Sequence, residues 1–164
     1  MTATTIELTL NGITQQLTVS DDELLLDVLR RRLGCTSVRE GCGVGACGAC
    51  TALVDGKSTS TCLVLAVRAD GAQVTTAEGL PAADPVITSF VEAGALQCGY
   101  CTPGFVMMAT ELLAENPRPT PEDIAEHLEG NICRCGTYPE IRAAILAAAR
   151  RKAAAMTAGQ EAGA

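Results

Sequence analysis

The sequence predicts an α+β fold in two parts, a small mixed sheet crossed by one helix and then a group of four helices. Alternating apolar and polar runs fill the start of the chain, and helix-start signals recur after residue 78. In addition, eight of the nine cysteines form two groups, one in each part. We therefore place the domains at residues 1–77 and 78–150 and expect residues 151–164 to form a flexible tail.

The first part is expected to contain two hairpins with a helix between them. IELTL and QQLTV alternate on either side of Asn11-Gly12, with a loop longer than two residues, and TALV and STSTCLVLAV flank an Asp-Gly pair. AQVTT adds one more strand. Asp21 or Asp22 can cap the helix, and Gly34 would end it. Its apolar residues at helical spacing are Leu24, Leu25, Val28, Leu29 and Leu33.

The second part is expected to be helical because it contains repeated helix-start signals. These are Asp84-Pro85, Thr102-Pro103, Thr120-Pro121 with Asp123, and Thr137 with Glu140. The last two have the spacing of a capping box, in which an acidic residue follows the threonine by three positions. Asn116-Pro117 should close the second of these helices.

Composition excludes several function classes. The net charge of -7 and the pI near 4.7 argue against a nucleic-acid partner, which would need a basic face, and the 2% of aromatic residues offers little base stacking. Residues 1–20 lack the basic start and apolar run of a secretory signal, and no stretch reaches about eighteen apolar residues. We expect a soluble cytoplasmic protein without a membrane span, with co-export beside a partner as the alternative.

The first cysteine group comprises Cys42, Cys47, Cys50 and Cys62, with the spacing Cys-x4-Cys-x2-Cys-x11-Cys. Its first three members match the plant-type ferredoxin pattern for a [2Fe–2S] cluster. Four thiolates must converge on two irons, so the loop has to turn back on itself with its backbone N–H groups directed at the sulfurs. Glycine permits the positive φ and close approach that this requires, and the loop glycines are Gly41, Gly43, Gly45 and Gly48.

Other uses of these thiols fit less well. Zinc usually takes two separated Cys-x2-4-Cys knuckles, whereas three ligands here crowd one loop. A redox pair formed by Cys47 and Cys50 leaves Cys42 and Cys62 without a role. A disulfide scaffold disagrees with the odd number of cysteines in a chain without a signal peptide.

The second cysteine group comprises Cys98, Cys101, Cys133 and Cys135. Each of its two pairs immediately precedes a helix start, so a bound cluster would lie between two helix N-termini, which favour negative charge. Cys133 and Cys135 cannot share one face of a regular helix and should lie in a turn. This pattern alone leaves zinc and iron–sulfur open, and the neighbouring ferredoxin-like loop favours iron–sulfur.

Three ordered motifs resemble the two-cluster iron–sulfur small subunit of the molybdenum hydroxylases, the xanthine oxidase family. They are GCGVGACGAC with Cys62, QCGYCTPG at 97–104 and GNICRCGTYPEI at 130–141. The resemblance covers roughly residues 4–150. It implies a ferredoxin-like β-grasp domain followed by an all-α four-helix iron–sulfur domain.

The resemblance also implies a mechanism and partners. In the family, a molybdopterin cofactor in a large subunit hydroxylates substrate with oxygen from water, and electrons leave singly through the helical-domain cluster and then the ferredoxin-like cluster. They pass to a medium subunit that carries FAD, or to a cytochrome. Residues matching Gln97 and Cys135 contact the pterin. The assembly is a hetero-oligomer that can dimerise.

One motif departs from the common family pattern. Relatives often read Cys-Arg-Cys-Thr-Gly-Tyr, whereas this chain reads Cys-Arg-Cys-Gly-Thr-Tyr from Cys133 to Tyr138. We associate this variant with members that lack a flavin subunit, so the final acceptor stays open. We expect the molybdenum and flavin portions to lie on other chains and this chain to catalyse no hydroxylation alone.

Two competing functions remain. One is a free-standing two-cluster electron carrier or redox sensor, and the other is a zinc-stabilised interaction module. Exposed apolar surface on the helical domain would favour a docked subunit over a free carrier.

The other conspicuous side chains have structural explanations. We expect Cys35 to be a buried structural thiol, His127 to face solvent and Met107 and Met108 to belong to a helix core. Residues 30–32 are three arginines, which we expect to form a solvated helix end.

Overall fold

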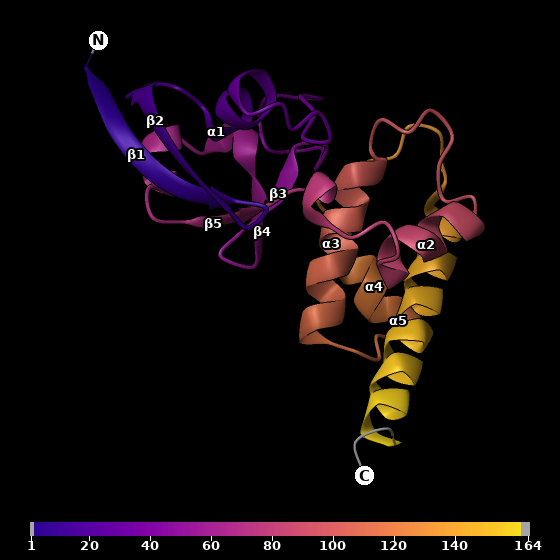
Figure 1. The fold of residues 1–164 in the computed structure, drawn as a ribbon. Coiled ribbons are helices and arrows are strands. Elements are labelled where there is room, and N and C mark those ends of the chain that lie inside the picture. Colours follow the sequence, from indigo (N-terminus) through magenta and orange to yellow (C-terminus); the bar gives the residue numbers. More distant parts are fainter. Residues whose placement is uncertain (1, 162–164) are drawn as a thin grey trace.

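The computed structural model describes residues 2–161 and places a sheet and a group of helices side by side (Figure 1). The five-stranded sheet has the order β2-β1-β5-β3-β4, in which β1 and β5 are parallel and the other neighbours antiparallel. The strands are β1 Ala3–Leu10, β2 Ile13–Ser20, β3 Thr51–Val54, β4 Lys57–Ser60 and β5 Gln73–Thr75. The fold is therefore mixed α and β, as predicted.

Both predicted hairpins are present, with a tighter turn at the first than the sequence suggested. Leu10 pairs with Ile13, so that loop has two residues and not more. Asn11 and Asp55 both have φ of 51°, followed by glycines at positive φ, which is the backbone of a type I′ turn. Local turn chemistry thus determined both hairpins.

The helix expected from Leu24 to Leu33 is shorter and differently wound. It begins as α1, Leu25–Asp27, and continues as a π-helix over Val28–Arg32. The expected caps are wrong, because Leu24 occupies the cap position without a side-chain bond. Asp21 instead accepts hydrogen bonds from the hydroxyls of Thr4 in β1 and of Thr2 just before it. Gly34 follows the helix at a φ of +74°, in agreement with the predicted end.

The strand expected through STSTCLVLAV ends early. β4 stops at Ser60, and a 3-10 turn over Thr61–Leu63 follows. The Thr61 hydroxyl donates to the carbonyl of Cys50 at 2.8 Å, which holds this turn under the cysteine loop. Leaving the sheet here allows buried Cys62 to lie beside the other thiols of its group.

The four predicted helix starts are all present. The helices are α2 Pro85–Glu92, α3 Thr102–Glu115, α4 Pro121–His127 and α5 Tyr138–Glu161. Asp84 accepts from the Val86 N–H, and Thr120 and Asp123 form the reciprocal capping box. The Thr137 hydroxyl behaves differently and lies 3.1 Å from the sulfur of Cys133.

The tail prediction is wrong for residues 151–161, which continue helix α5. Alanine has the highest helix propensity, and the run after Lys152 is rich in it. Arg151 also ties this segment to α2, because its guanidinium donates to the Thr88 hydroxyl at 3.0 Å and pairs with Glu92. Residues 162–164 lie outside the described range.

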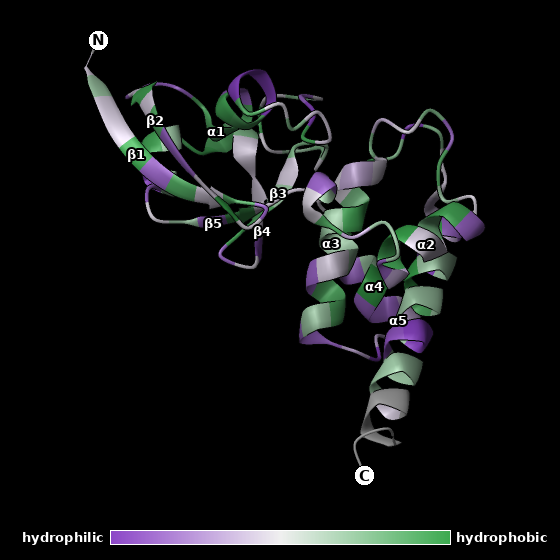
Figure 2. Cartoon of the chain, viewed as in Figure 1, coloured by the Kyte–Doolittle hydropathy of each residue, from purple (hydrophilic) through white to green (hydrophobic). Residues whose placement is uncertain are grey.

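Each half of the molecule has its own hydrophobic core. One core packs α1 and the π-helix against the sheet, and the other lies among α2, α3, α4 and α5, where Phe90, Phe105 and Ile145 are fully buried. Figure 2 shows hydrophobic residues in both halves, flanked by hydrophilic ones. Within residues 2–161, no helix has the length and apolarity needed to cross a bilayer.

Where the two halves meet, α3 contacts β3 and β4. Glu111 is buried there, and its carboxylate accepts the Ser58 N–H at 3.0 Å. His127, which was expected to face solvent, lies partly buried at α3, with Nε2 3.1 Å from the Met108 carbonyl and 3.5 Å from Glu111. The prediction for His127 was wrong because α4 packs against α3 on this side.

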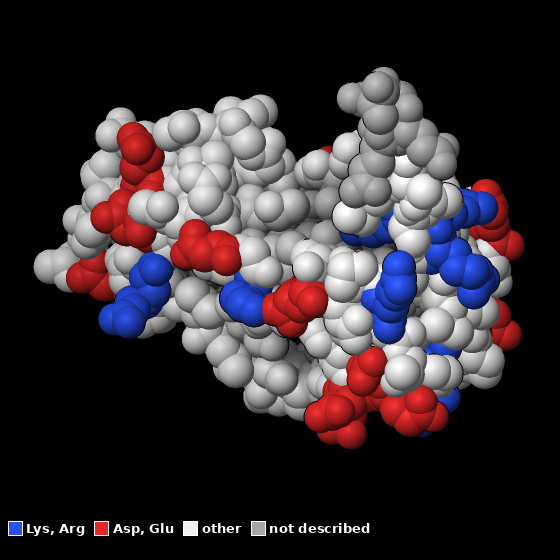
Figure 3. All heavy atoms as spheres, turned by 90° about the horizontal axis from the view of Figure 1, so that it is seen from below, with Lys and Arg blue, Asp and Glu red and all other residues white. Residues whose placement is uncertain are grey.

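The remaining structural expectations hold in part. Cys35 and Met107 are buried and Met108 is partly buried. Arg30 is exposed, but it also donates to the carbonyls of Thr36 and Val38, so it fastens the segment after the helix. Seen from below, basic side chains gather mainly over the helical half, whereas acidic ones occur over both halves (Figure 3).

Candidate functional site

The first cysteine group lies in a loop whose backbone turns toward the sulfurs. The N–H groups of Val44 and Ala46 point at the Cys42 sulfur, at 3.4 and 3.3 Å. Positive φ occurs at three of the four expected glycines, Gly43, Gly45 and Gly48. Gly41 has a different role, because a Cβ there would lie 2.8 Å from the Cys47 sulfur. The loop therefore needs glycine both for its turns and for close approach.

Contacts among these thiols shift their acidity in opposite directions. Hydrogen bonds from the Val44 and Ala46 N–H groups, with a further one from the Cys47 thiol, lower the pKa of Cys42 to about 7. Burial raises the pKa of Cys62 to about 11, aided by its hydrogen bond with Cys50. The group thus consists of two neighbouring pairs, with Cys42 on the solvent side and Cys50 and Cys62 buried.

The second cysteine group is assembled from two turns that precede α3 and α5. The N–H of Tyr100 lowers the pKa of Cys98, and a contact with Cys135 acts in the same direction. Burial raises the pKa of Cys101 to about 12, aided by a hydrogen bond with Cys133. The pairs in this group are therefore Cys98 with Cys135 and Cys101 with Cys133.

Cys133 is buried, yet its thiol is acidic. Burial acts to raise its pKa, but hydrogen bonds from the Thr137 hydroxyl and backbone, from Cys101 and from the Cys135 N–H outweigh this and lower the pKa to about 7. The Cys133 N–H donates to the Tyr138 hydroxyl at 2.8 Å. Thiolate is the form that binds metal, so these donors favour a ligand state at Cys133.

The thiol pairs fit a binuclear centre. A [2Fe–2S] cluster takes four cysteine thiolates, two for each iron. Each cysteine group contains two pairs of neighbouring thiols, which matches one pair for each iron. Within residues 2–161, no three His, Cys, Asp or Glu side chains converge closely enough to hold one metal ion. The N–H and hydroxyl donors directed at the sulfurs are also of the kind that iron–sulfur clusters use.

A hydrogen-bonded seam joins the two sites. The Ile132 N–H donates to the Cys47 carbonyl at 3.0 Å, and the buried Asn131 amide lies 3.4 Å from the Gly48 carbonyl. Nearby, the Tyr100 hydroxyl donates to the Glu40 carbonyl at 2.6 Å. Since Ile132 immediately precedes Cys133, this seam connects the cysteine-bearing segments of both groups.

Arg39 strengthens the same seam. Its guanidinium donates to the Gly99 carbonyl and lies 5.4 Å from the centre of the Tyr100 ring, a cation–π contact. A cavity of about 180 Å³ is lined by Tyr100 and by members of both cysteine groups. Sequence reasoning missed Arg39, Tyr100, Asn131 and Ile132, since no local pattern signals contacts between the two parts.

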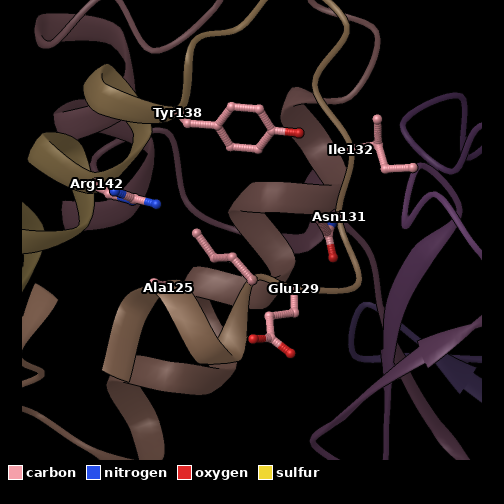
Figure 4. Close-up of a pocket in the computed structure, with 7 residues that line it drawn as sticks. Ala125, Glu129, Asn131, Ile132, Tyr138 and Arg142 are labelled. Atoms are coloured by element: carbon pink, nitrogen blue, oxygen red, sulfur yellow. The ribbon is translucent and has the colours of Figure 1, made fainter. Parts of the chain in front are cut away.

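A second cavity, of about 250 Å³, lies between α4 and α5 and is also lined by Ile132, the residue before Cys133 (Figure 4). Tyr138 and Arg142 enter it from α5, and Ala125 from α4. The Tyr138 hydroxyl points toward the segment that carries Ile132, and its ring packs edge-on against Phe105 at 6.0 Å. Tyr138 is thus fixed at both ends beside the second cysteine group.

Gln97 is exposed between Leu96 and Cys98, which are exposed as well. Leu96, Tyr100 and Ile132 are 44%, 48% and 52% exposed. Tyr100 and Ile132 also line the cavity shared by the two groups. We refer to these three exposed side chains as the apolar rim, in which Tyr100 and Ile132 share the cavity and Leu96 directly precedes Gln97 in the chain.

Two family models match the chain. A 2Fe-2S iron-sulfur cluster binding domain matches residues 8–77, and a [2Fe-2S] binding domain matches residues 76–146. Each match contains one of the two cysteine groups described above.

Named relatives extend the match to nearly the whole chain. The nicotinate dehydrogenase small FeS subunit of Eubacterium barkeri is 45% identical over 154 residues, covering 92% of this chain and 98% of the relative. The quinoline 2-oxidoreductase structure from Pseudomonas putida 86 aligns with a TM-score of 0.87 at 39% identity, covering 92% of this chain and 96% of that one.

A third match places the same unit within a longer chain. The aldehyde oxidoreductase structure from Desulfovibrio desulfuricans aligns with a TM-score of 0.85 at 45% identity, covering 88% of this chain but 17% of that chain. The two relatives that this chain matches over nearly their full length establish the family. The chain belongs to the two-cluster iron–sulfur small subunits of the molybdenum hydroxylases, the xanthine oxidase family.

Proposed function

We propose that this electron-transfer subunit relays single electrons from a molybdopterin centre in a large partner subunit to a flavin subunit or a cytochrome. The second cysteine group would hold the [2Fe–2S] cluster that receives the electron, and the first group the cluster that passes it on. When bound, each cluster supplies a one-electron carrier. The observation that carries this proposal is the seam, in which the Ile132 N–H bonds the Cys47 carbonyl.

The chain's own residues have distinct tasks in this relay. The four thiolates of each group bind one cluster, and the donors at Cys42 and Cys133 stabilise negative charge on the sulfurs. Asn131, Tyr100 and Arg39 hold the two ligand loops together. A fixed separation between the two sites follows from these contacts, because each bonds the backbone of the opposite loop.

We assign these tasks to two domains, a ferredoxin-like β-grasp domain at 1–77 and a four-helix domain at 78–150. Two separate hydrophobic cores support the division. So does the distribution of the thiols, since the first group contacts the sheet core and the second the helical core.

The apolar rim supports docking of a partner subunit beside the second group. Single exposed apolar residues are ordinary, but here Tyr100 and Ile132 line one cavity with Cys98, and exposed Leu96 directly precedes exposed Gln97. Gln97 and Cys135 would contact the pterin carried by that partner. A free-standing carrier would keep this side polar, so the rim favours a docked subunit over a free carrier or sensor.

Metal analysis of anaerobically purified protein tests the cluster content. About four irons and four labile sulfides per chain are expected, with two distinguishable paramagnetic signals after reduction. Stoichiometric zinc without iron would support the zinc-stabilised module and overturn the proposal.

Co-purification tests the partner. The chain would be expressed together with a large molybdenum subunit, as wild type, as Leu96→Glu and as Ile13→Glu. Ile13 is 64% exposed on β2 and serves as the matched control. Loss of the large subunit is expected for Leu96→Glu alone. A chain that purifies alone with both clusters, and never retains the large subunit, would favour the free carrier.

A further inference from the structure

The threonine that should cap helix α5 contacts a ligand sulfur instead. Thr137 precedes the first residue of α5, and its hydroxyl oxygen lies 3.1 Å from the Cys133 sulfur. Both residues are buried, at 4% and 6% exposure, so water does not compete for this contact. Thr120, at the equivalent position before α4, forms the capping box in the ordinary way. The difference between these two threonines requires an explanation.

A tight turn brings the hydroxyl to the sulfur. The Gly136 N–H donates to the Cys133 carbonyl at 3.3 Å, and Gly136 has a φ of +81°, which glycine adopts without strain. Thr137 follows immediately and lies next to Cys133. The order Gly136-Thr137 therefore matters, because the reverse order would put a β-branched residue at the positive φ.

The Tyr138 hydroxyl holds the other side of Cys133. It accepts the Cys133 N–H at 2.8 Å, and the Tyr138 ring packs edge-on against Phe105. The backbone of Cys133 is thus clamped while its sulfur meets Thr137. The contact is therefore held by the turn on one side of Cys133 and by Tyr138 on the other.

We propose that Thr137 is a positioning residue that raises the reduction potential of the cluster held by the second cysteine group, by donating a hydrogen bond to the Cys133 sulfur. This inference rests on the proposed function. A metal-bound thiolate carries no proton, so the hydroxyl must be the donor. Reduction adds one electron and increases negative charge on the sulfurs, which strengthens this bond, while the proton stays on the threonine oxygen.

The first cysteine group receives its bonds differently. Cys42 accepts from two backbone N–H groups, which no side-chain substitution removes. The second group can therefore be tuned by a single residue, whereas the first cannot be tuned in this way. Reduction potentials measured separately for the two clusters show whether a substitution affects the first group or the second.

The test is a redox titration of the purified protein, in which the two paramagnetic signals report the reduction of each cluster. Thr137→Val removes the hydroxyl at nearly constant shape, Thr137→Ser keeps it, and Thr120→Val removes a hydroxyl of the same type at the start of another helix. Thr137→Val should disfavour reduction of one cluster about tenfold, which is about 59 mV for a one-electron couple. Thr137→Ser and Thr120→Val should leave both potentials near the wild-type values.

Unchanged potentials in Thr137→Val, with both signals present, would overturn the inference and leave the proposed function intact. Equal shifts in Thr137→Val and Thr120→Val would also overturn it, since a general effect of losing a threonine hydroxyl would then explain both. Absence of two iron–sulfur signals in the wild type would instead overturn the proposed function itself. Each result is read from the potentials, without a turnover assay.

Discussion

The two cysteine groups solve the same chemical problem with different parts of the chain. The first is built largely within residues 41–50, where the backbone N–H groups of Val44 and Ala46 serve the Cys42 sulfur. The second joins two turns that are far apart in sequence, and a side-chain hydroxyl serves the Cys133 sulfur. A site made of local backbone depends mainly on its own loop. A site made of two turns depends on the packing of α3 and α5.

Loss of one ligand from each group is the strongest way to break this comparison. Cys47→Ser should remove the cluster held by the first cysteine group, called the outer cluster, and leave the helical half and its contact with the large subunit formed. Substrate should then still reduce the cluster held by the second group, called the inner cluster, while turnover with the external acceptor falls to near zero. Cys135→Ser should block electron exit at its first step and weaken retention of the cofactor. Rapid mixing of each complex with substrate, following cluster bleaching and turnover separately, measures both effects.

Gln97→Ala is the milder control for these variants, because it keeps all eight thiolates and removes only a proposed hydrogen-bonding partner of the pterin. Normal turnover in a Cys47→Ser complex that lacks the outer cluster would contradict the order of the relay. Normal electron delivery to the outer cluster in Cys135→Ser would contradict it equally.

The seam between the groups can be disrupted without touching a thiol. A Cβ at Gly104 would lie 2.2 Å from the Gly48 carbonyl oxygen, so Gly104→Ala pushes the first loop away from α3. We expect a loss of about 1–3 kcal/mol in unfolding free energy, despite the better helix propensity of alanine. Gly130→Ala is the control, because a Cβ at that residue would meet nothing within 4 Å and its φ is not in the left-handed region. Denaturant titrations that find equal stability for both variants would disprove the clash.

Substitutions of Glu111 test whether its hydrogen bond from the helical half to the sheet half stabilises the fold. Glu111→Leu removes the acceptor of the Ser58 N–H and should cost about 1–2 kcal/mol, since a partly buried donor is left unpaired. Glu111→Gln keeps an acceptor oxygen at nearly the same place and should cost much less. Urea unfolding of the two variants makes the comparison. If Gln and Leu were equally destabilising, the bond to Ser58 would not be the reason for the buried carboxylate.

The smallest expected effect concerns Glu78, in the connection between the two halves. Burial acts to raise its pKa, but hydrogen bonds from the Ser37 N–H and hydroxyl and from Thr76 outweigh this, and the pKa lies below its usual value of 4.5. A depressed pKa stabilises the fold above the unfolded-state pKa, and the contribution disappears as the pH falls through the folded-state pKa. Because the side chain is largely exposed, we expect less than about 1 kcal/mol.

The measurement is the stability difference between wild type and Glu78→Gln from about pH 7 to about pH 3.5. It should be largest at the upper end and decrease toward the lower end. Glu126→Gln, at an exposed position on α4, corrects for general effects of acid. A difference that grows on acidification would contradict the assigned direction.

The sequence by itself determined the features that depend on neighbouring residues. Asn11 and Asp55 predicted both hairpin turns, Asp84 and Thr120 predicted helix starts, and the cysteine spacing with its glycines predicted the loop around the first group. These features need only the conformational preferences of a few consecutive residues. Such preferences are the same wherever the segment lies in the fold.

Tertiary structure alone decided how distant segments meet. It turned the Thr137 hydroxyl from a helix cap to the Cys133 sulfur, placed the Ile132 N–H on the Cys47 carbonyl, partly buried His127 against α3 and continued α5 beyond Arg151. Each of these outcomes depends on which buried surfaces pack together, and the free energy of that packing is shared among residues far apart in the chain. No short stretch contains that information, because a side chain selects its hydrogen-bond partner only after the surrounding elements have fixed which groups are within reach.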